Sequence, residues 1–323
     1  SSQRTDLTSV FTFTIDADET KDVDDALSLE TTSTGFRLGI HIADVTSVVG
    51  PGEVIWNCAM TRCTSVYFPD TTIPMLPTDL SEQALSLHVG KKRNAISYIV
   101  ELDSALSITS SKIIPSVIIV DQRFSYDEVD EILSAEVVSS PYSNTLLDLW
   151  RLASALESTR IENGAQAMPR SEVFPVVDKE FKVSLKQYDE TTPARMLIGE
   201  LMILANVISA EYAKEKNIPY IFRSQESSNE LANGQVIFRK SITSTTSGRH
   251  SGVGVSAYCQ VTSPIRRFGD LINQYQLVQS LTSQNTPISK DEIDGLCVDI
   301  EHKTSQVKQV QKERTRYWIY QYI

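Results

Sequence analysis

A run of aspartates near the N-terminus is the feature that most limits what this chain can fold into. Residues 14–27, TIDADETKDVDDAL, contain five aspartates within ten positions: Asp16, Asp18, Asp22, Asp24 and Asp25. Carboxylates this close repel one another, so such a cluster is stable at low cost only where cations neutralise it. The fold must therefore bring cations to this segment or leave it exposed to solvent.

The residues before the cluster favour the first alternative. Phe11, Phe13 and Ile15 alternate with threonines, which is the period of a half-buried strand, and a rigid strand can hold a metal site at its end. Two divalent ions bridged by carboxylates would favour in-line attack on a phosphodiester. A solvated acidic loop remains the simpler alternative. A calcium-binding EF-hand fails, because Lys21 and Leu27 occupy positions that require Gly and Glu.

Hydrophobic periodicity predicts a sheet followed by helices. Strand-like segments rich in alternating or β-branched residues predict one sheet over about residues 10–122. Helical spacing predicts helices over 143–162, from Pro193 to about 215, after Ser263-Pro264, and over about 290–322. Thr192-Pro193 and Ser263-Pro264 each resemble an N-cap residue followed by Pro at the first helical position. The Gly- and Ser-rich residues 241–256 predict a loop.

Composition excludes several classes of protein. The chain has 323 residues, of which 41% are hydrophobic and 22% charged, as in soluble globular proteins. It has no run of 18 apolar residues and no apolar signal region, so we expect neither a membrane span nor secretion. The cysteines, Cys58, Cys63, Cys259 and Cys297, form no CxxC pair and are interpreted as reduced core thiols without a structural zinc site.

The charge balance is unusual for a nucleic-acid-binding protein. Thirty Lys and Arg against 41 Asp and Glu give a net charge of −11, whereas general nucleic-acid binders are usually basic. The chain would repel a polyanion unless a local basic channel or bound cations overrule the total. Simple solubility explains the same charge equally well.

Two arginines are candidates for binding phosphate. Arg266 and Arg267 follow Ser263-Pro264, which predicts that both lie in a first helical turn, where free N–H groups and the helix dipole favour an anion. An arginine fork adds bidentate phosphate binding and stabilises charge in a transition state. The alternative is a surface arginine paired with Asp270. Tyr67 could stack on a base near a cleavage site, although a core tyrosine is the ordinary interpretation.

The histidines give no sign of a metal site or a nucleophilic triad. His41, His88, His250 and His302 form no pair at metal spacing, and no motif supplies a serine for His41. We therefore interpret His41 as a histidine whose hydrogen bonds are satisfied within a strand.

The aspartate segment resembles the signature of the ribonuclease II/ribonuclease R family, whose catalytic unit is the RNB domain. Five further segments resemble family blocks in family order: GIHIADVTSVVGPG, TSVYFPDTTIPMLPTDLSEQALSL, FSYDEVDEIL, GELMILAN and YCQVTSPIRRFGDLINQYQL. The resemblance covers essentially the whole chain. It implies a mixed α/β (α+β) RNB fold, a curved and largely antiparallel sheet surrounded by helices, and one catalytic domain over residues 1–323. Flanking cold-shock and S1 OB-fold domains are then expected to be absent from this chain.

The resemblance also implies roles for particular residues. Asp16, Asp22, Asp24 and Asp25 match the aspartates that hold or border two Mg²⁺ ions, with Mn²⁺ as an alternative, and Asp24 matches the one essential for chemistry. Arg266 matches a residue at the scissile phosphate, and Arg267 matches its neighbour, a salt-bridge partner that we also expect near RNA. Tyr67 and Tyr126 match aromatics that contact RNA near the active-site nucleotide.

Three positions depart from the family pattern. Ala17 stands where many members have Pro, which affects strand geometry rather than ligation. Met168 occupies the place of an aromatic that stacks the 3′ bases, so the base clamp is expected to be weaker or filled from elsewhere. Glu313 is offset by one from a family glutamate, and a solvated helix face is an equal interpretation.

The implied activity is magnesium-dependent 3′→5′ hydrolysis of single-stranded RNA to nucleoside 5′-monophosphates. The implied setting is intracellular, in the bacterial cytoplasm or an organelle matrix, with no membrane and with RNA-degradation complexes as further partners. A catalytically inactive RNB scaffold that binds RNA or an assembly partner is the main alternative, and loss of aspartates would mark it. The aspartate cluster alone also leaves open an endonuclease or a DNase.

Overall fold

The computed structural model describes residues 4–134, 140–165, 171–189, 191–226, 240–282 and 287–323. Seven strands form one sheet in the order β1-β8-β7-β4-β3-β2-β9. Their bounds are β1 (Thr5–Asp6), β2 (Phe13–Asp16), β3 (Asp25–Thr32), β4 (Gly35–Ala43), β7 (Lys92–Asp103), β8 (Ile108–Ile119) and β9 (Gln122–Ser125). Neighbours from β2 to β8 are antiparallel, whereas β1 and β9 pair in parallel at the two edges. The predicted mixed fold with a largely antiparallel sheet is confirmed.

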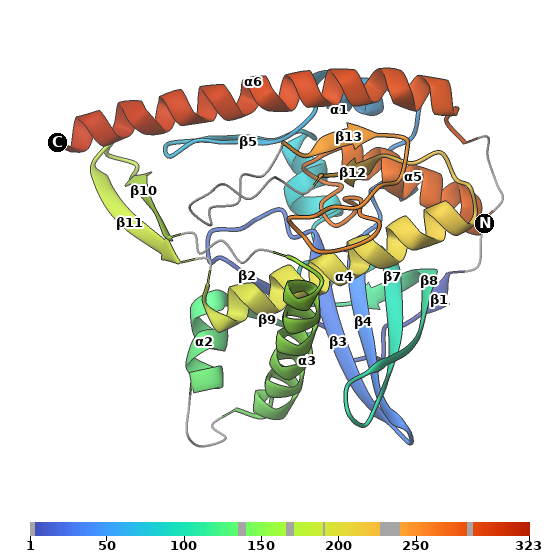
Figure 1. The fold of residues 1–323 in the computed structure, drawn as a ribbon. Coiled ribbons are helices and arrows are strands. Elements are labelled where there is room, and N and C mark those ends of the chain that lie inside the picture. Colours follow the sequence, from blue (N-terminus) through green and yellow to red (C-terminus); the bar gives the residue numbers. More distant parts are fainter. Residues whose placement is uncertain (1–3, 135–139, 166–170, 190, 227–239, 283–286) are drawn as a thin grey trace, which may run out of the picture.

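Smaller elements surround this sheet (Figure 1). The helices are α1 (Val54–Arg62), α2 (Tyr126–Ser134), α3 (Ser143–Glu162), α4 (Pro193–Glu215), α5 (Phe268–Thr282) and α6 (Lys290–Tyr322), with short helical turns η1 (Val45–Ser47) and η2 (Asp79–Ala84). Three hairpin-like pairs complete the described fold: β5 (Val66–Tyr67) with β6 (Thr72–Ile73), β10 (Ser171–Val177) with β11 (Val183–Asp189), and β12 (Phe222–Ser224) with β13 (Ile242–Ser244). The expected loop at 241–256 therefore contains a short strand.

Side chains that alternate along the strands contribute to two hydrophobic cores. Leu38, Ile40 and Ile42 of β4 are buried in a cluster with residues of α2, α3 and α4. Small residues of β4 and β7, such as Ala43 and Ala95, belong to a second cluster with α1 and α5. Because successive side chains of a strand point to opposite faces, one alternating pattern supplies both cores.

His41 lies on β4 among buried serines. Its Nδ1 lies 2.7 Å from Ser97 Oγ and its Nε2 lies 2.9 Å from Ser28 Oγ. Burial lowers the pKa of His41 to about 4, so the ring is neutral at physiological pH. Gly39 leaves the room for this contact, since a Cβ there would lie 2.4 Å from Ser28 Oγ. The prediction of a satisfied strand histidine is confirmed.

Helix α4 is apolar because it is a core helix. By length and composition it is the one helix, within the described ranges, that could cross a membrane, with a mean hydropathy of 1.4 in its best window. However, 61% of that window is buried inside the fold. Eleven of its residues are buried, and several of them, including Leu197 and Leu201, pack in the first core cluster. Thr192 occupies the predicted N-cap position, although its hydroxyl makes no capping hydrogen bond.

The cysteines are partly as expected. Cys63, Cys259 and Cys297 are buried free thiols, but Cys58 is exposed on α1, so its assignment to the core was wrong. The reason is helical geometry, since Cys58 lies on the opposite face of α1 from the buried Trp56 and Ala59.

Candidate active site

The predicted site residues converge on one cavity of about 500 Å³ at the end of the sheet. Strand β2 ends at Asp16 and β3 begins at Asp25, so the loop between these antiparallel strands carries Asp22 and Asp24 to the same place. The lining includes all eight candidates: Asp16, Asp22, Asp24, Asp25, Tyr67, Tyr126, Arg266 and Arg267. Asp18 is exposed and is not among the lining residues, which agrees with its exclusion from the predicted set.

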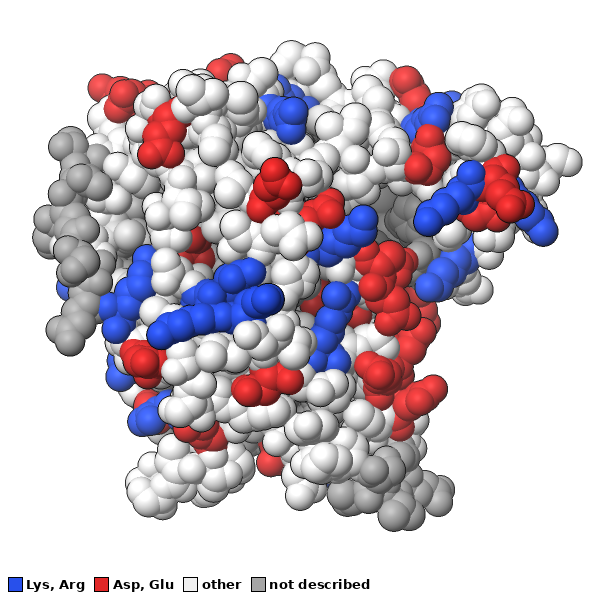
Figure 2. Space-filling view, turned by 180° about the vertical axis from the view of Figure 1, so that it is seen from behind, with Lys and Arg blue, Asp and Glu red and all other residues white. Residues whose placement is uncertain are grey.

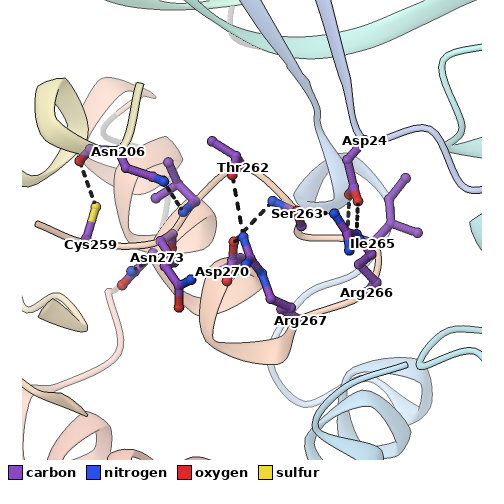
Figure 3. Close-up of polar contacts among 12 residues, drawn as sticks. Asp24, Asn206, Cys259, Thr262, Ser263, Ile265, Arg266, Arg267, Asp270 and Asn273 are labelled. Atoms are coloured by element: carbon purple, nitrogen blue, oxygen red, sulfur yellow. Dashed lines mark hydrogen bonds and ion pairs between the residues drawn. The ribbon is translucent and has the colours of Figure 1, made fainter. Parts of the chain in front are cut away.

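Asp24 is held rigidly by a segment more than 240 positions away. Its side chain is buried; Oδ1 accepts a hydrogen bond from the Ile265 amide at 3.0 Å, and Oδ2 accepts one from Arg266 Nε at 2.9 Å (Figure 3). Arg266 Nη2 also donates to Ser263 Oγ at 3.0 Å. Burial raises the pKa of Asp24 to about 6, and the Arg266 charge opposes that rise. The carboxylate and the guanidinium are thus fixed relative to each other inside the cavity.

The neighbouring aspartates are less well compensated. Burial raises the pKa of Asp16 to about 6, against the opposing charge of Arg123, and one of its oxygens, Oδ2, is buried without a hydrogen-bond partner. Burial, followed by the charge of Asp16, raises the pKa of Asp25 well above its ordinary value. Asp22 accepts a hydrogen bond from the Tyr67 hydroxyl at 2.9 Å. Negative charge therefore exceeds its compensation here, despite Arg266.

The donor set fits a hard divalent cation. Carboxylate oxygens are the ligands that Mg²⁺ and Mn²⁺ prefer. Asp16 Oδ2 has no hydrogen-bond partner and its charge acts on Asp25, so a positive charge placed between these carboxylates would be favourable. Within the part of the chain that is described, no three Asp, Glu, His or Cys side chains already form a metal-binding group. Asp22 and Asp24 each accept a hydrogen bond from a neighbouring side chain, and each carboxylate retains lone pairs for a further partner.

These pKa shifts predict an inverted pH dependence of stability in the absence of metal. The folded pKa values of Asp16 and Asp24, about 6, lie above the unfolded value of 3.8, so the folded state holds protons that the unfolded state releases. Their contribution to the free energy of unfolding is therefore fully present below pH 3.8 and is lost as pH rises to about 6.

We expect Asp16→Asn to raise the melting temperature in EDTA at pH 7.5 and to change it less at pH 4. Mg²⁺ should raise the melting temperature of the wild-type chain at pH 7.5 more than that of the variant, because a ligand of the folded state stabilises it. Thermal unfolding at both pH values, with and without Mg²⁺, measures this. Asp18→Asn is the matched control, since Asp18 is exposed. An equal Mg²⁺ response in all three proteins would contradict a cation site at Asp16.

The arginine pair lies in a turn rather than in the predicted helix. Helix α5 begins at Phe268, so the placement of Arg266 and Arg267 in its first turn was wrong. The backbone here pairs with residues 63–65 instead: the Ser65 amide donates to the Arg266 carbonyl and the Phe268 amide donates to the Cys63 carbonyl. The Ile265 amide donates its hydrogen bond to Asp24, so a phosphate bound here would contact guanidinium groups rather than helix-terminal amides.

Arg267 has a structural partner. Its Nη2 lies 2.6 Å from Asp270 Oδ2, which also accepts a hydrogen bond from the Ser263 amide at 3.1 Å (Figure 3). The expected salt bridge between Arg267 and Asp270 is confirmed. Of the two arginines, Arg266 is the one bonded to the aspartate cluster.

Both tyrosines line the cavity, but only Tyr67 is exposed, whereas Tyr126 is partly buried and also packs against the first core cluster. Tyr67 is 40% exposed, and its hydroxyl contacts Asp22. Tyr126 begins α2, and the guanidinium of Arg195 lies 4.2 Å from its ring centroid. Burial raises the pKa of Tyr126 to about 12, which keeps its hydroxyl protonated.

Sequence reasoning missed several groups around the cavity. Arg123 Nη2 donates to the carbonyl oxygens of Ala17 and Thr20 and so braces the aspartate loop. Asn206, Tyr258 and Gln260 also line the cavity. Asn206, Tyr258 and Gln260 lie in the segments GELMILAN and YCQVTSPIRRFGDLINQYQL, which were matched to family blocks, but they are uncharged and were not singled out. Arg123 could also have been found, as a cation on a strand that ends beside the next candidate, Tyr126.

Two departures from the family pattern have different outcomes. Glu313 lies on an exposed face of α6, where its carboxylate accepts a hydrogen bond from Gln309 at 3.1 Å. It is not among the cavity-lining residues, in agreement with the solvated-face interpretation. Met168 lies outside the described residues.

Solved structures share this fold. The apo RNase R of Mycoplasma genitalium superposes with a TM-score of 0.88 at 24% identity, covering 98% of this chain and 58% of that one. An active-site mutant of the Dss1 exoribonuclease of Candida glabrata gives 0.89 at 23% identity, covering 99% of this chain and 46% of that one. At this identity the likeness establishes the RNase R fold.

Sequence comparison then establishes the family. The RNB domain family model matches residues 4–237 and 232–283. An uncharacterized ribonuclease of Synechocystis is 31% identical over 99% of this chain and 50% of its own length. The chloroplastic/mitochondrial ribonuclease II of Arabidopsis thaliana is 30% identical over 99% of this chain and 42% of its own. The chain belongs to the RNB family of ribonuclease II/R proteins and spans about half the length of these curated relatives.

Proposed function

We propose that residues 1–323 act as one RNB catalytic domain that hydrolyses single-stranded RNA from its 3′ end, releasing nucleoside 5′-monophosphates. The observation that carries the proposal is the convergence of four aspartates and Arg266 on one cavity. Relatives in this family are named ribonucleases, and the Mycoplasma genitalium RNase R has been solved with ribose-methylated single-stranded RNA and with double-stranded RNA.

The residues have separable roles in this proposal. Asp16, Asp22, Asp24 and Asp25 would hold the two divalent cations, Mg²⁺ or Mn²⁺. Bound there, the cations would supply activation of the attacking water and stabilisation of the leaving oxygen. Arg266 contacts the scissile phosphate and balances charge that develops there, while Asp24 fixes its guanidinium. Tyr67 and Tyr126 contact the terminal nucleotide. Arg267, through Asp270, holds the turn and borders the RNA.

Cation binding also reconciles the acidic charge with a polyanionic substrate. The net charge is −11, but Figure 2 shows Lys and Arg gathered in a band across one face of the molecule, with acidic residues beside it. Neutralising the aspartate cluster removes the strongest local repulsion for RNA. By analogy with its relatives, the proposed setting is intracellular, in a bacterial cytoplasm or an organelle, and RNA-degradation complexes are proposed as partners.

Labelled substrates test the reaction and its direction. With Mg²⁺, 3′-labelled single-stranded RNA should release labelled mononucleotide from the first turnover, whereas 5′-labelled RNA should shorten progressively. Internal fragments at early times would identify an endonuclease, and equal cleavage of DNA would identify a different specificity. Loss of activity in EDTA and recovery with Mg²⁺ should accompany the proposed reaction.

An inactive RNB scaffold that binds RNA or an assembly partner is the second candidate. The yeast pseudonuclease Ssd1 shares this fold with a TM-score of 0.78 at 18% identity, covering 97% of this chain. The fold is thus compatible with an inactive protein. The retained aspartates and their contact with Arg266 favour the enzyme. Tight RNA binding with no mononucleotide release under any divalent cation would support the scaffold.

A further inference from the structure

A cluster of aromatic and cationic side chains lies far from the sheet, at the C-terminal end of α6. The tip of the β10–β11 hairpin meets this end of the helix (Figure 1). Together they enclose an open cavity of about 710 Å³. We call its main residues the C-terminal aromatic surface: Phe181, Lys182, Arg314, Tyr317, Trp318 and Tyr322.

Phe181 lies exposed at the tip of the hairpin in an unfavourable backbone conformation. Its side chain is 71% exposed and its φ is +61°, a left-handed conformation that is uncommon for a bulky residue. The carboxylate of Asp178 stabilises the turn by accepting hydrogen bonds from the Glu180 and Lys182 amides, both at 2.9 Å. An exposed aromatic held in a strained turn suggests a binding role.

The rings and cations have the chemistry of a nucleobase platform. Phe181 lies nearly parallel to Trp318, at an interplanar angle of 14° with centroids 6.4 Å apart. Trp318 itself is buried, so the rings exposed for stacking are Phe181, Tyr317 and Tyr322. The guanidinium of Arg314 lies 5.2 Å from the Trp318 ring and 5.3 Å from the Tyr317 ring, and Lys182 is exposed at the rim. Aromatic faces combined with cations bind single-stranded nucleic acid with little sequence preference.

One short segment of the chain contacts this surface and also lines the catalytic cavity. Asp70 accepts hydrogen bonds from Arg314 Nε at 3.1 Å and from Trp318 Nε1 at 2.9 Å. Three positions earlier, Tyr67 lines the catalytic cavity, and its carbonyl accepts a hydrogen bond from Gln311 of α6 at 3.1 Å. The β5–β6 segment therefore carries a residue of the catalytic cavity at Tyr67 and a partner of the C-terminal aromatic surface at Asp70.

We propose that the C-terminal aromatic surface is a second binding site for single-stranded RNA, which stacks bases 5′ to the nucleotides in the catalytic cavity. This assignment of RNA rests on the proposed function. A protein segment covering the same rings is the alternative that the experiment separates.

The experiment uses the Asp24→Asn chain, which should bind RNA without consuming it, and compares Phe181→Ala with Tyr320→Ala in that background. Tyr320 is 67% exposed on the same helix but is not among the residues lining this cavity, so it is a matched control. Dissociation constants are measured for oligonucleotides of about four and about sixteen nucleotides, the range of site sizes for stacking platforms. A 4-thiouridine placed near the 5′ end of the longer one allows photocrosslinking.

Loss of one stacked base should weaken binding of the longer oligonucleotide at least about fivefold. The short one should lose much less affinity, and Tyr320→Ala should match the parent protein at both lengths. The crosslink should map to peptides containing Phe181 or Trp318. Equal effects of Phe181→Ala at both lengths, or no effect at either, would overturn the proposal.

Failure of this site is distinguishable from failure of the proposed function. Normal mononucleotide release by the wild-type chain, with Phe181→Ala without effect on binding, would leave the activity standing and remove the second site. A 5′ crosslink at Phe181 without hydrolysis by the wild-type chain would support the second site and contradict the proposed activity. If instead the crosslink is absent and Phe181→Ala changes the oligomeric state, the rings cover protein rather than RNA.

Discussion

Asp24→Asn is expected to lower the rate of mononucleotide release at least roughly a hundredfold, while the affinity for single-stranded RNA stays within about threefold of wild type. The substitution keeps an oxygen to accept from the Ile265 amide but places an NH₂ group opposite Arg266 Nε, which needs an acceptor. It therefore removes a charge from the cation site and also releases the guanidinium. Turnover of 3′-labelled RNA and equilibrium binding with Mg²⁺ measure the two effects.

Asp18→Asn is the control for this experiment, because Asp18 lies in the same segment but is exposed. It should retain full activity. If Asp24→Asn kept activity within about tenfold of wild type, the chemistry would not depend on this carboxylate. If the variant lost RNA binding together with activity, Asp24 would contribute to RNA binding rather than to the chemical step.

Arg266→Lys is expected to behave like Arg266→Ala, with turnover at saturating RNA reduced roughly a hundredfold in both. Arg266 uses Nε toward Asp24 and Nη2 toward Ser263, so its planar guanidinium is oriented by two separate contacts. A lysine ammonium is a single point charge and cannot make both contacts in that plane while facing a phosphate.

Both Arg266 variants should still fold, because the Asp24 carboxyl can take up a proton when it loses its partner; its pKa is already about 6. Arg151→Lys is the matched control, since Arg151 is 58% exposed and pairs only with Asp148 among the contacts described. Unchanged turnover in the Lys and Ala variants would show that Arg266 has no part in the reaction.

Local patterns predicted the elements well. The helix over 143–162 was placed to the residue because its apolar spacing is uninterrupted, and Phe13 and Ile15 predicted strand β2 because alternation needs no knowledge of the partner strand. The turn after Ser263-Pro264 was misassigned for a physical reason. Its backbone groups bond to residues 63–65 and to Asp24, and no local signal announces partners about 200 residues away.

Some site residues could likewise be predicted from the sequence, whereas others depend on contacts between distant segments. The aspartates and Arg266 were found because charge in an unusual density is visible in sequence. The resemblance already separated Arg266 from Arg267 and anticipated the salt bridge of Arg267, but the bond between Arg266 and Asp24 was not expected, because it joins residues 242 positions apart. Arg195 and the aromatic surface around Phe181 depend wholly on distant packing, so sequence reasoning did not reach them.

The bond between the Ile265 amide and Asp24 spans 241 positions, which has a consequence for how the protein is made. During synthesis the acidic loop emerges before its partners, and Asp24 must wait for about 240 further residues before those partners exist. Contacts of such long sequence separation form slowly, since closing the loop costs entropy before any contact is gained. Until about residue 266 has been made, Asp24 therefore lacks both the Ile265 amide and Arg266, and the active centre should form only after the strands that carry its aspartates.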